Sequence, residues 1–224
     1  MEAKITVRDL FDLSYSIAGE RLATFTYPHE ALPHIGKWIE EIGATLDPLK
    51  YDNPSEGVWI AKSAEVAPSV HIDGPAIICE GAKLRHCAYL RPNVIVGAGA
   101  TVGNSSEIKN AILFDGAQVP HFNYVGDSIL GHRAHLGAAA ILSNFRGDGA
   151  NVTLRAGALV LETGMRKVGA FIGDFGEIGA GAVLNPGTVV GRSAMIYPLS
   201  SVRGFVPEQH IYKDKDTVVP RVIE

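Results

Sequence analysis

Residues 102–145 gather polar and titratable side chains of the types that bind or transform small molecules. The segment contains Gly103, Asn104, Glu107, Lys109, a run of seven residues from His121 to Asp127, and Asn144. The run begins with His121, and an imidazole is a side chain that can accept a proton near neutral pH. A purely structural histidine is the alternative interpretation.

A second candidate is the basic turn Gly164-Met165-Arg166-Lys167, in a segment that breaks the surrounding pattern. Excursions from a regular scaffold are where binding loops usually lie. The two cations could hold a phosphate, or they could simply be solvated.

A repeat of six residues must position these side chains. An aliphatic residue recurs at every sixth position from Ile60 to Ile108, and the period returns, after two slips of one residue and a longer break, as far as Val202. A helix repeats every ~3.6 residues and does not fit this spacing. Short strands joined by turns do fit, with asparagine or some of the 25 glycines at the corners. Three such units close a triangular coil, so the spacing predicts an all-β triangular solenoid.

Both slips fall among the polar residues described above. Interrupted regularity together with clustered polar groups is typical of a functional site in a repeat protein.

The hexads divide the chain into three parts. Residues 58–206 are predicted to form the solenoid, with an inserted loop at about 145–168 whose middle, residues 152–161, is a strand or ribbon. Residues 1–57 lack the period and are predicted to form a small helical N-terminal cap over the open end of the solenoid. Residues 207–224 form a C-terminal tail, expected to pack back along the prism or against a trimer.

Two helices are expected in the N-terminal part. Thr6 and Asp9 have the spacing of a capping box, which predicts a helix carrying Val7, Leu10, Leu13 and Ile17. A second helix is predicted over residues 32–42, with Gly43 as its stop. Its apolar side would consist of Ile35, Trp38, Ile39 and Ile42.

Composition argues against several classes of protein. A formal net charge of -4 without a run of Lys or Arg disfavours nucleic acid and anionic membranes as main partners. No apolar stretch reaches the ~20 residues of a membrane span. The first ten residues lack the apolar core of a signal peptide, so a cytoplasmic location is expected. Cys79 and Cys87 are expected to be free thiols.

Residues 56–206 resemble the hexapeptide-repeat transferases, whose prism is a left-handed parallel β-helix. The pattern of that family has an arginine in an L-R-P turn, then G-N-x-x-E-x-K, then H-x-x-Y-x-G-D, then an asparagine. Here these are Arg91, residues 103–109, residues 121–127 and Asn144. These residues closely resemble the acetyltransferase half of the bifunctional bacterial enzyme that makes UDP-N-acetylglucosamine. They resemble even more closely the C-terminal domain of archaeal-type sugar-1-phosphate nucleotidylyltransferases.

The resemblance implies a role for each matching residue. His121 would be the general base that takes a proton as an amino sugar attacks the thioester of acetyl-CoA or another acyl-CoA. Arg91 and Lys109 would grip the sugar phosphate, with a fork and a point charge respectively. Tyr124 and Asn144 would contact the substrate.

The sequence also departs from the family pattern. His135 stands where the acetyltransferase has an asparagine, and we retain it as a substrate-binding candidate. Ala138 lies in the turn expected to receive acetyl-CoA, but Ala139 replaces the second glycine of that turn. The N-Y-D-G motif becomes Asn144-Phe145-Arg146-Gly147, and the lysine that follows it in the family is missing. No phosphate loop of the nucleotidyl-transfer type is found, so no pyrophosphorylase activity is predicted for this chain by itself.

Three functions remain open at this point. The first is acyl transfer to a phosphorylated amino sugar or a nucleotide sugar, by a homotrimer with sites between its subunits. The second is a non-catalytic module that binds a sugar phosphate or nucleotide sugar. The third, less favoured, is a zinc enzyme similar to the γ-type carbonic anhydrases, with His121, His132 and His135 as ligands and His86 nearby. Our assignment of site residues includes no metal ligand.

Overall fold

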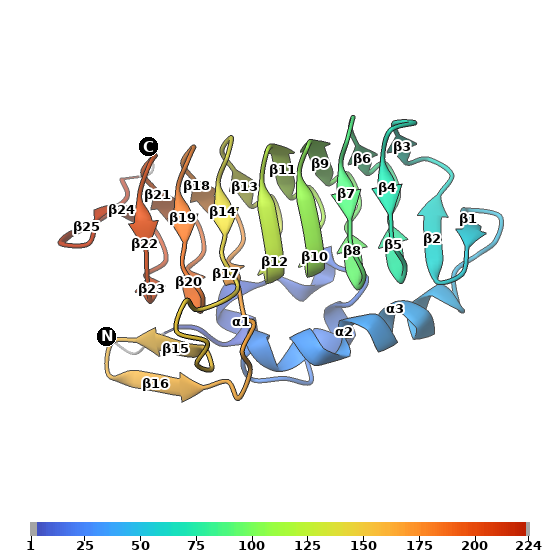
Figure 1. Ribbon diagram of the computed structural model, residues 1–224. Helices are drawn as coiled ribbons and strands as arrows, with labels where there is room; N and C mark the ends of the chain where they lie inside the picture. Colours follow the sequence, from blue (N-terminus) through green and yellow to red (C-terminus); the bar gives the residue numbers. More distant parts are fainter. Residues whose placement is uncertain (1–3, 223–224) are drawn as a thin grey trace.

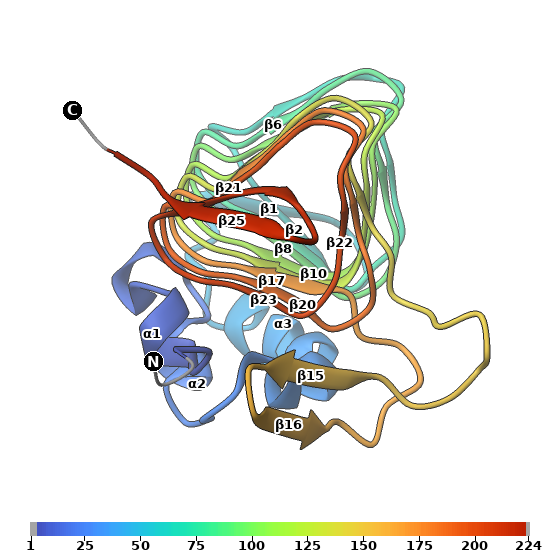
Figure 2. The ribbon, with the colours of Figure 1, turned by 90° about the vertical axis from the view of Figure 1, so that its left-hand side faces the viewer.

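The computed structural model describes residues 4–222, and it shows a left-handed parallel β-helix with an added helical layer (Figures 1 and 2). Each coil contributes one short strand to each of three faces. The predicted all-β solenoid is therefore confirmed. Parallel pairing continues from coil to coil along the whole prism, as the strand registers show.

The helix-covered face consists of β2 (Val58–Ala61), β5 (Ala76–Ile78), β8 (Val94–Val96), the second halves of β10 (Glu107–Leu113) and β12 (Tyr124–Leu130), β17 (Ala170–Ile172), β20 (Thr188–Val190) and β23 (Phe205–Val206). At one end β1 (Tyr51–Ser55) pairs with β2 in the antiparallel sense.

The β3–β24 face consists of β3 (Glu65–Val66), β6 (Lys83–Leu84), β9 (Thr101–Asn104), β11 (Gln118–His121), β13 (His135–Leu136), β18 (Glu177–Ile178), β21 (Met195–Ile196) and β24 (His210–Asp214). The β4–β22 face consists of β4 (His71–Ile72), β7 (Tyr89–Leu90), the first halves of β10 and β12, β14 (Ile141–Leu142), β19 (Val183–Leu184) and β22 (Ser201–Val202).

The aliphatic residue of each hexad points into the prism. Leu84, Val102, Val119, Leu136 and Ile178 stack in successive coils of the β3–β24 face, each at most 2% exposed. Small residues accompany them where the chain turns, as the repeat predicts. Burial of this continuous apolar column is the main driving force that holds the coils together.

The N-terminal helices lie along the side of the prism and not over its end, so the expected end cap is wrong (Figure 2). These elements are α1 (Val7–Leu10), the 3₁₀ helices η1 (Leu13–Tyr15) and η2 (Pro28–His34), α2 (Gly19–Leu22) and α3 (Ile35–Gly43). The reason is an outward-facing apolar column on the helix-covered face, made by Ile77, Ile95, Ile112, Ile129, Phe171 and Val189. The buried side of α3, which includes Ile35 and Ile39, covers this column.

The first helix is shorter than the sequence predicts. The capping box of Thr6 and Asp9 is confirmed, but α1 ends at Leu10 and the chain becomes extended at Phe11. Asp174, from a distant coil, accepts the backbone N–H of Asp12 at 2.7 Å and donates its own N–H to the Leu10 carbonyl at 3.0 Å. These bonds to the prism replace the helical bonds that would have continued α1.

The second helix begins at Ile35, three residues later than predicted, because Pro28–His34 form η2. It ends at Gly43, as predicted, but for a different reason. A Cβ atom on Gly43 would lie 2.4 Å from the ring of Trp59, so the glycine permits close packing against β2. The following residue, Ala44, has right-handed helical backbone angles.

The inserted loop contains an antiparallel hairpin, β15 (Thr153–Ala156) and β16 (Leu159–Glu162), which is shifted by one residue from the strand or ribbon predicted over residues 152–161. Val152 and Leu154 are buried in the apolar cluster that the helices form with the helix-covered face. After the insertion the coils resume, with Glu177 of β18 beside His135 of β13.

The C-terminal segment extends the end of the prism instead of packing back along its side, so packing along the side, one of the two alternatives for this segment, is wrong. Its strand β24 adds to the end of the β3–β24 face, and Tyr212 inserts into the core, where it is 6% exposed. The last strand, β25 (Thr217–Pro220), turns back on β24. No helix among residues 4–222 is long and apolar enough to cross a membrane.

Asp174 gives a first prediction. Its carboxylate is 2% exposed and accepts the N–H groups of Asp12 and His132, at 2.7 and 2.8 Å. We expect Asp174→Ala to lower the free energy of unfolding by about 2–4 kcal/mol, since two backbone donors lose a buried, charged acceptor. Urea denaturation would measure the change, with the exposed Asp216→Ala as the control. A loss no larger than that of the control would contradict the anchoring role.

The two thiols give a second prediction. Burial raises the pKa of Cys79 to about 12, whereas Cys87 is exposed. Because the thiolate is the reactive form, only Cys87 should react with a chromogenic disulfide reagent in the folded protein. Cys87→Ser should abolish this native signal, and the second thiol should react only after denaturation. Rapid reaction of two thiols in the folded wild type would contradict the burial of Cys79.

Candidate functional site

The two slips in the repeat form a polar corner between the β4–β22 face and the helix-covered face. Asn110 and Asp127, 17 residues apart, occupy this corner in successive coils with φ of 47° and 48°. Asparagine and aspartate tolerate this left-handed conformation better than most residues. The Asn110 amide donates to Asp127 Oδ1 at 2.9 Å, and the Asn144 amide of the following coil donates to Asp127 Oδ2.

Two cations lie side by side next to this corner, on the β4–β22 face. The register of β7 with β10 places Arg91 beside Lys109. Arg91 Nη1 lies 2.9 Å from Glu107 Oε1, and Lys109 Nζ lies 3.3 Å from Asp127 Oδ2. The carboxylates therefore hold the two cationic groups at the surface of the face.

Gly126 leaves room for two further groups. It is the neighbour of Lys109 in the next coil. A Cβ atom on Gly126 would lie 2.6 Å from Tyr124 Oη and 2.5 Å from Asn144 Nδ2. The tyrosine hydroxyl and the asparagine amide thus converge over the bare glycine. Burial raises the pKa of Tyr124, so its hydroxyl stays protonated at neutral pH and can donate a hydrogen bond.

The inserted loop returns to the prism at this place. Lys167 forms an isolated antiparallel bridge with Phe145, and the N–H of Val168 donates to the Asn144 carbonyl at 3.0 Å. The Arg166 guanidinium lies 5.7 Å from the centre of the Phe145 ring. The basic turn is thereby folded back over the corner.

Together these residues line one cavity of about 570 Å³. Its lining consists of Arg91, Lys109, Tyr124, Asn144, Phe145, Arg166 and Lys167. Four of the five predicted substrate-binding residues meet here, and the basic turn joins them. Four cations and no carboxylate in the lining suit an anionic ligand such as a phosphate.

His121 lies at a different corner of the prism, where the β3–β24 face meets the β4–β22 face. It is not among the residues that line the cationic cavity. It ends β11 on the β3–β24 face, followed by Phe122 with φ of 53°. Its N–H donates to Asn123 Oδ1 at 2.9 Å, and its carbonyl accepts the N–H of Ala139 at 2.9 Å. The backbone of His121 is therefore held at both sides while the side chain is exposed.

Ala138 and His135 lie on the same side of that corner as His121. Ala138 is exposed in the adjacent coil, where Ala139 contacts His121 through its backbone. His135 is on β13, where its Nδ1 lies 2.9 Å from Glu177 Oε2. His135 does not line the cationic cavity, so its predicted contact with substrate has no support from the geometry of this chain.

The histidines named for a zinc site have separate contacts. His132 Nδ1 bonds to the Asp115 carbonyl at 2.8 Å, and its ring stacks on Tyr15 with centroids 3.7 Å apart. His86 Nδ1 bonds to Ser69. No group of three potential ligands is found in residues 4–222.

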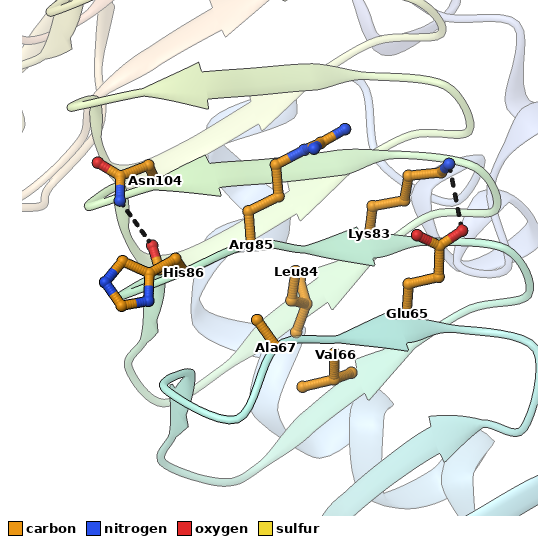
Figure 3. A pocket seen from close by; sticks show the side chains of 8 residues that line it. All are labelled: Glu65, Val66, Ala67, Lys83, Leu84, Arg85, His86 and Asn104. Carbon is orange, nitrogen blue, oxygen red and sulfur yellow. Dashed lines mark hydrogen bonds and ion pairs between the residues drawn. The ribbon is translucent and has the colours of Figure 1, made fainter.

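A separate groove lies along β3, β6 and β9, away from the cationic cavity (Figure 3). It contains a Lys83–Glu65 ion pair of 3.2 Å and an Asn104 amide that donates to the His86 carbonyl. None of the predicted site residues lines it, although Asn104 is the strand neighbour of His121.

Two features of the site were not predicted from the sequence. One is the contact of Asn110 with Asp127, and the other is that Arg166 and Arg91 line the same cavity. A signal for Asn110 exists, since Asn110, Asp127 and Asn144 follow one another at intervals of 17 residues. No comparable signal places the basic turn, because the path of the inserted loop is not periodic.

Several known proteins are similar to this chain in sequence. Residues 72–165 match the family model described as the GMPPB C-terminal domain. The chain is 35% identical over 206 residues to the "Bifunctional protein GlmU" of Methanococcus maripaludis, covering 83% of this chain and 50% of the relative. It is 34% identical over 141 residues to the "Bifunctional sugar-1-phosphate nucleotidylyltransferase/acetyltransferase" of Sulfurisphaera tokodaii, covering 63% and 35%.

The chain is thus similar to these proteins over much of its length, and the six-residue repeat itself is seen in the stacked core of the prism. It spans about half the length, or less, of these relatives. Among solved structures it is similar to a perosamine N-acetyltransferase mutant from Caulobacter crescentus, with a TM-score of 0.34 and 21% identity over 74% of this chain and 57% of that one.

Gly126 gives a third prediction. Gly126→Ala should push apart the Tyr124 hydroxyl and the Asn144 amide while leaving the prism folded. We expect the Kd for pyrophosphate, measured by calorimetry, to rise by about tenfold, equivalent to about 1.4 kcal/mol. Gly147→Ala is the matched control, because a Cβ atom there would have no neighbour within 4 Å. Equal affinities for the two variants would show that the packing over Gly126 does not shape the cavity.

Proposed function

We propose that this protein transfers an acyl group from a CoA thioester to the amine of a phosphorylated amino sugar or nucleotide sugar. The observation that carries the proposal is a cationic cavity lined by Arg91, Lys109, Tyr124 and Asn144, with His121 at the neighbouring corner. The relatives support it, because two of them are named as bifunctional proteins and one explicitly as an acetyltransferase.

The phosphate of the sugar would bind to the cations. Arg91 offers a planar fork of donors and Lys109 a point charge, which together suit the oxygens of a phosphoryl group. The Tyr124 hydroxyl and the Asn144 amide, both directed over Gly126, would then donate to the sugar. Positioning of this kind turns a bimolecular reaction into one between held groups.

His121 would act as the general base. As the sugar nitrogen bonds to the acyl carbon, the imidazole takes the proton that the nitrogen loses, and the C–S bond of the thioester breaks. The thiolate of CoA leaves and is then protonated, so the enzyme forms no covalent intermediate. A base contributes a factor of about 10²–10⁴ to such a step.

The corner beside His121 fits a thioester donor. Ala138 and Ala139 are exposed there, and Ala139 takes φ of 58° without blocking the surface with a long side chain. Ala138 would line the path of the CoA arm, and the bound CoA would supply the activated acyl group. The extra methyl group of Ala139, compared with glycine, narrows this path.

A homotrimer would complete the site. Phe122 is 60% exposed and Leu199, at the same corner in a later coil, is 86% exposed. Exposed apolar groups along one edge favour burial against another subunit. We expect the neighbouring subunit to cover this edge and to enclose the side chain of His121.

His121 gives a fourth prediction. We expect His121→Ala to lower kcat for thiol release from acetyl-CoA by about 10²–10⁴-fold, because the base is lost. The Kd for the sugar phosphate should change little, because His121 does not line the cationic cavity. His34→Ala, an exposed histidine of the helical layer, is the control and should keep wild-type activity. A variant at position 121 with unchanged kcat would overturn the assignment of the base.

One observation favours a second function, a binding module without turnover. The candidate base and the cationic cavity lie on different sides of a corner within one chain. Tight binding of a sugar phosphate by a folded protein, with no thiol release from any of a panel of amino-sugar phosphates and UDP-sugars, would establish this function in place of acyl transfer.

A further inference from the structure

The inserted loop supplies the cavity with cations that have no carboxylate partner among residues 4–222. Arg91 and Lys109 are each paired with an acid, Glu107 and Asp127 respectively. Arg166 and Lys167 line the same cavity from the other side, and neither forms an ion pair within residues 4–222. The only hydrogen bond of the Arg166 side chain in this range runs from Nε to the Gly149 carbonyl at 3.2 Å. Most of the uncompensated positive charge thus comes from the loop.

Phe145 separates this cavity from a second, smaller one. The smaller cavity has a volume of about 290 Å³ and is lined, besides Phe145, mainly by polar groups of Ser143, Arg146, Asp148, Asn185 and Arg203. Phe145 is 44% exposed and lines both cavities. Arg166 lies over its ring, and Arg146 is fixed by a hydrogen bond of 2.9 Å from Nε to Asp148.

We propose that the ligand of this site is a nucleoside diphosphate sugar and not a sugar 1-phosphate. The inference rests on the proposed function, because it places the sugar at Tyr124 and Asn144. The two linked phosphates lie between the cations of the prism face and those of the loop. The nucleoside passes over Phe145 into the smaller cavity.

The extent and the chemistry of the two cavities support this ligand. One phosphoryl group attached to one sugar fills only the larger cavity and leaves the smaller cavity beyond Phe145 unused. An exposed aromatic ring beside a guanidinium is a surface on which nucleic-acid bases stack. The hydroxyl, amide and charged groups beyond it can bind a ribose or the polar edge of a base.

Calorimetry on matched ligand pairs tests the proposal. The pairs are glucosamine 1-phosphate with UDP-glucosamine, and galactosamine 1-phosphate with UDP-galactosamine. We expect at least one UDP-sugar to bind about tenfold or more tightly than its sugar 1-phosphate. Phe145→Ala should remove most of that advantage, so that the ratio of the two affinities in each pair falls toward one. Phe145→Tyr should retain the advantage, because the ring remains.

The loop cations need their own variants. Arg166→Ala and Lys167→Ala should each weaken the UDP-sugar by about tenfold. Arg155→Ala, an exposed arginine of β15 that lines neither cavity, is the matched control and should bind like the wild type.

Equal affinities within both pairs, no binding of any of the four ligands, or a preference for the UDP-sugar that survives Phe145→Ala would each overturn the proposal. Thiol release with a sugar 1-phosphate but no preference for the nucleotide would overturn this inference and leave acyl transfer standing. A Phe145-dependent preference without thiol release would do the reverse.

Discussion

The buried carboxylate of Asp127 holds together donors that come from the coils on both sides of it. Lys109 and Asn110 reach it from the preceding coil, and Asn144 reaches it from the following one. A buried charge is stable only where such partners surround it. The Asp127 carboxylate and its three donors therefore hold one another in position. The carbonyl of Asn144 in turn holds the end of the inserted loop through Val168. The cavity therefore depends on a corner that exists only because two coils are one residue short.

The helical layer determines which surfaces are left for function. Helices and the β15–β16 hairpin bury the apolar column on one face of the prism. The other two faces and the edge between them remain open, and the cavity and His121 lie on either side of that edge. Asp174 fastens the N-terminal segment to the prism. The layer is thus a fixed part of the scaffold, although it contributes no residue to the cationic cavity.

The periodic part of the molecule could be predicted from sequence because each coil contacts mainly its neighbours. The period gives the strands, the inward aliphatic residues and the positions of the slips. It also brings Arg91, Lys109, Tyr124 and Asn144 together, since they lie on neighbouring coils of one face. The end of α1 could not be predicted, because Asp174 lies 162 residues beyond Asp12 in the chain. The position of the helices was missed for a related reason, since the outward apolar column alternates with inward residues and is hidden within the hexads.

The inserted loop leaves and rejoins the prism without changing the coils that follow. His135 and Glu177 are strand neighbours although 42 residues separate them, and parallel pairing continues beyond them as in the earlier coils. Outside the residues that join the apolar layer, such as Val152 and Leu154, the loop can therefore vary in length and composition during evolution at little cost to the scaffold. Ligand preference and fold stability would then be inherited through different segments of the gene. An engineer could graft loops at this junction and change what the protein recognises while keeping the same prism.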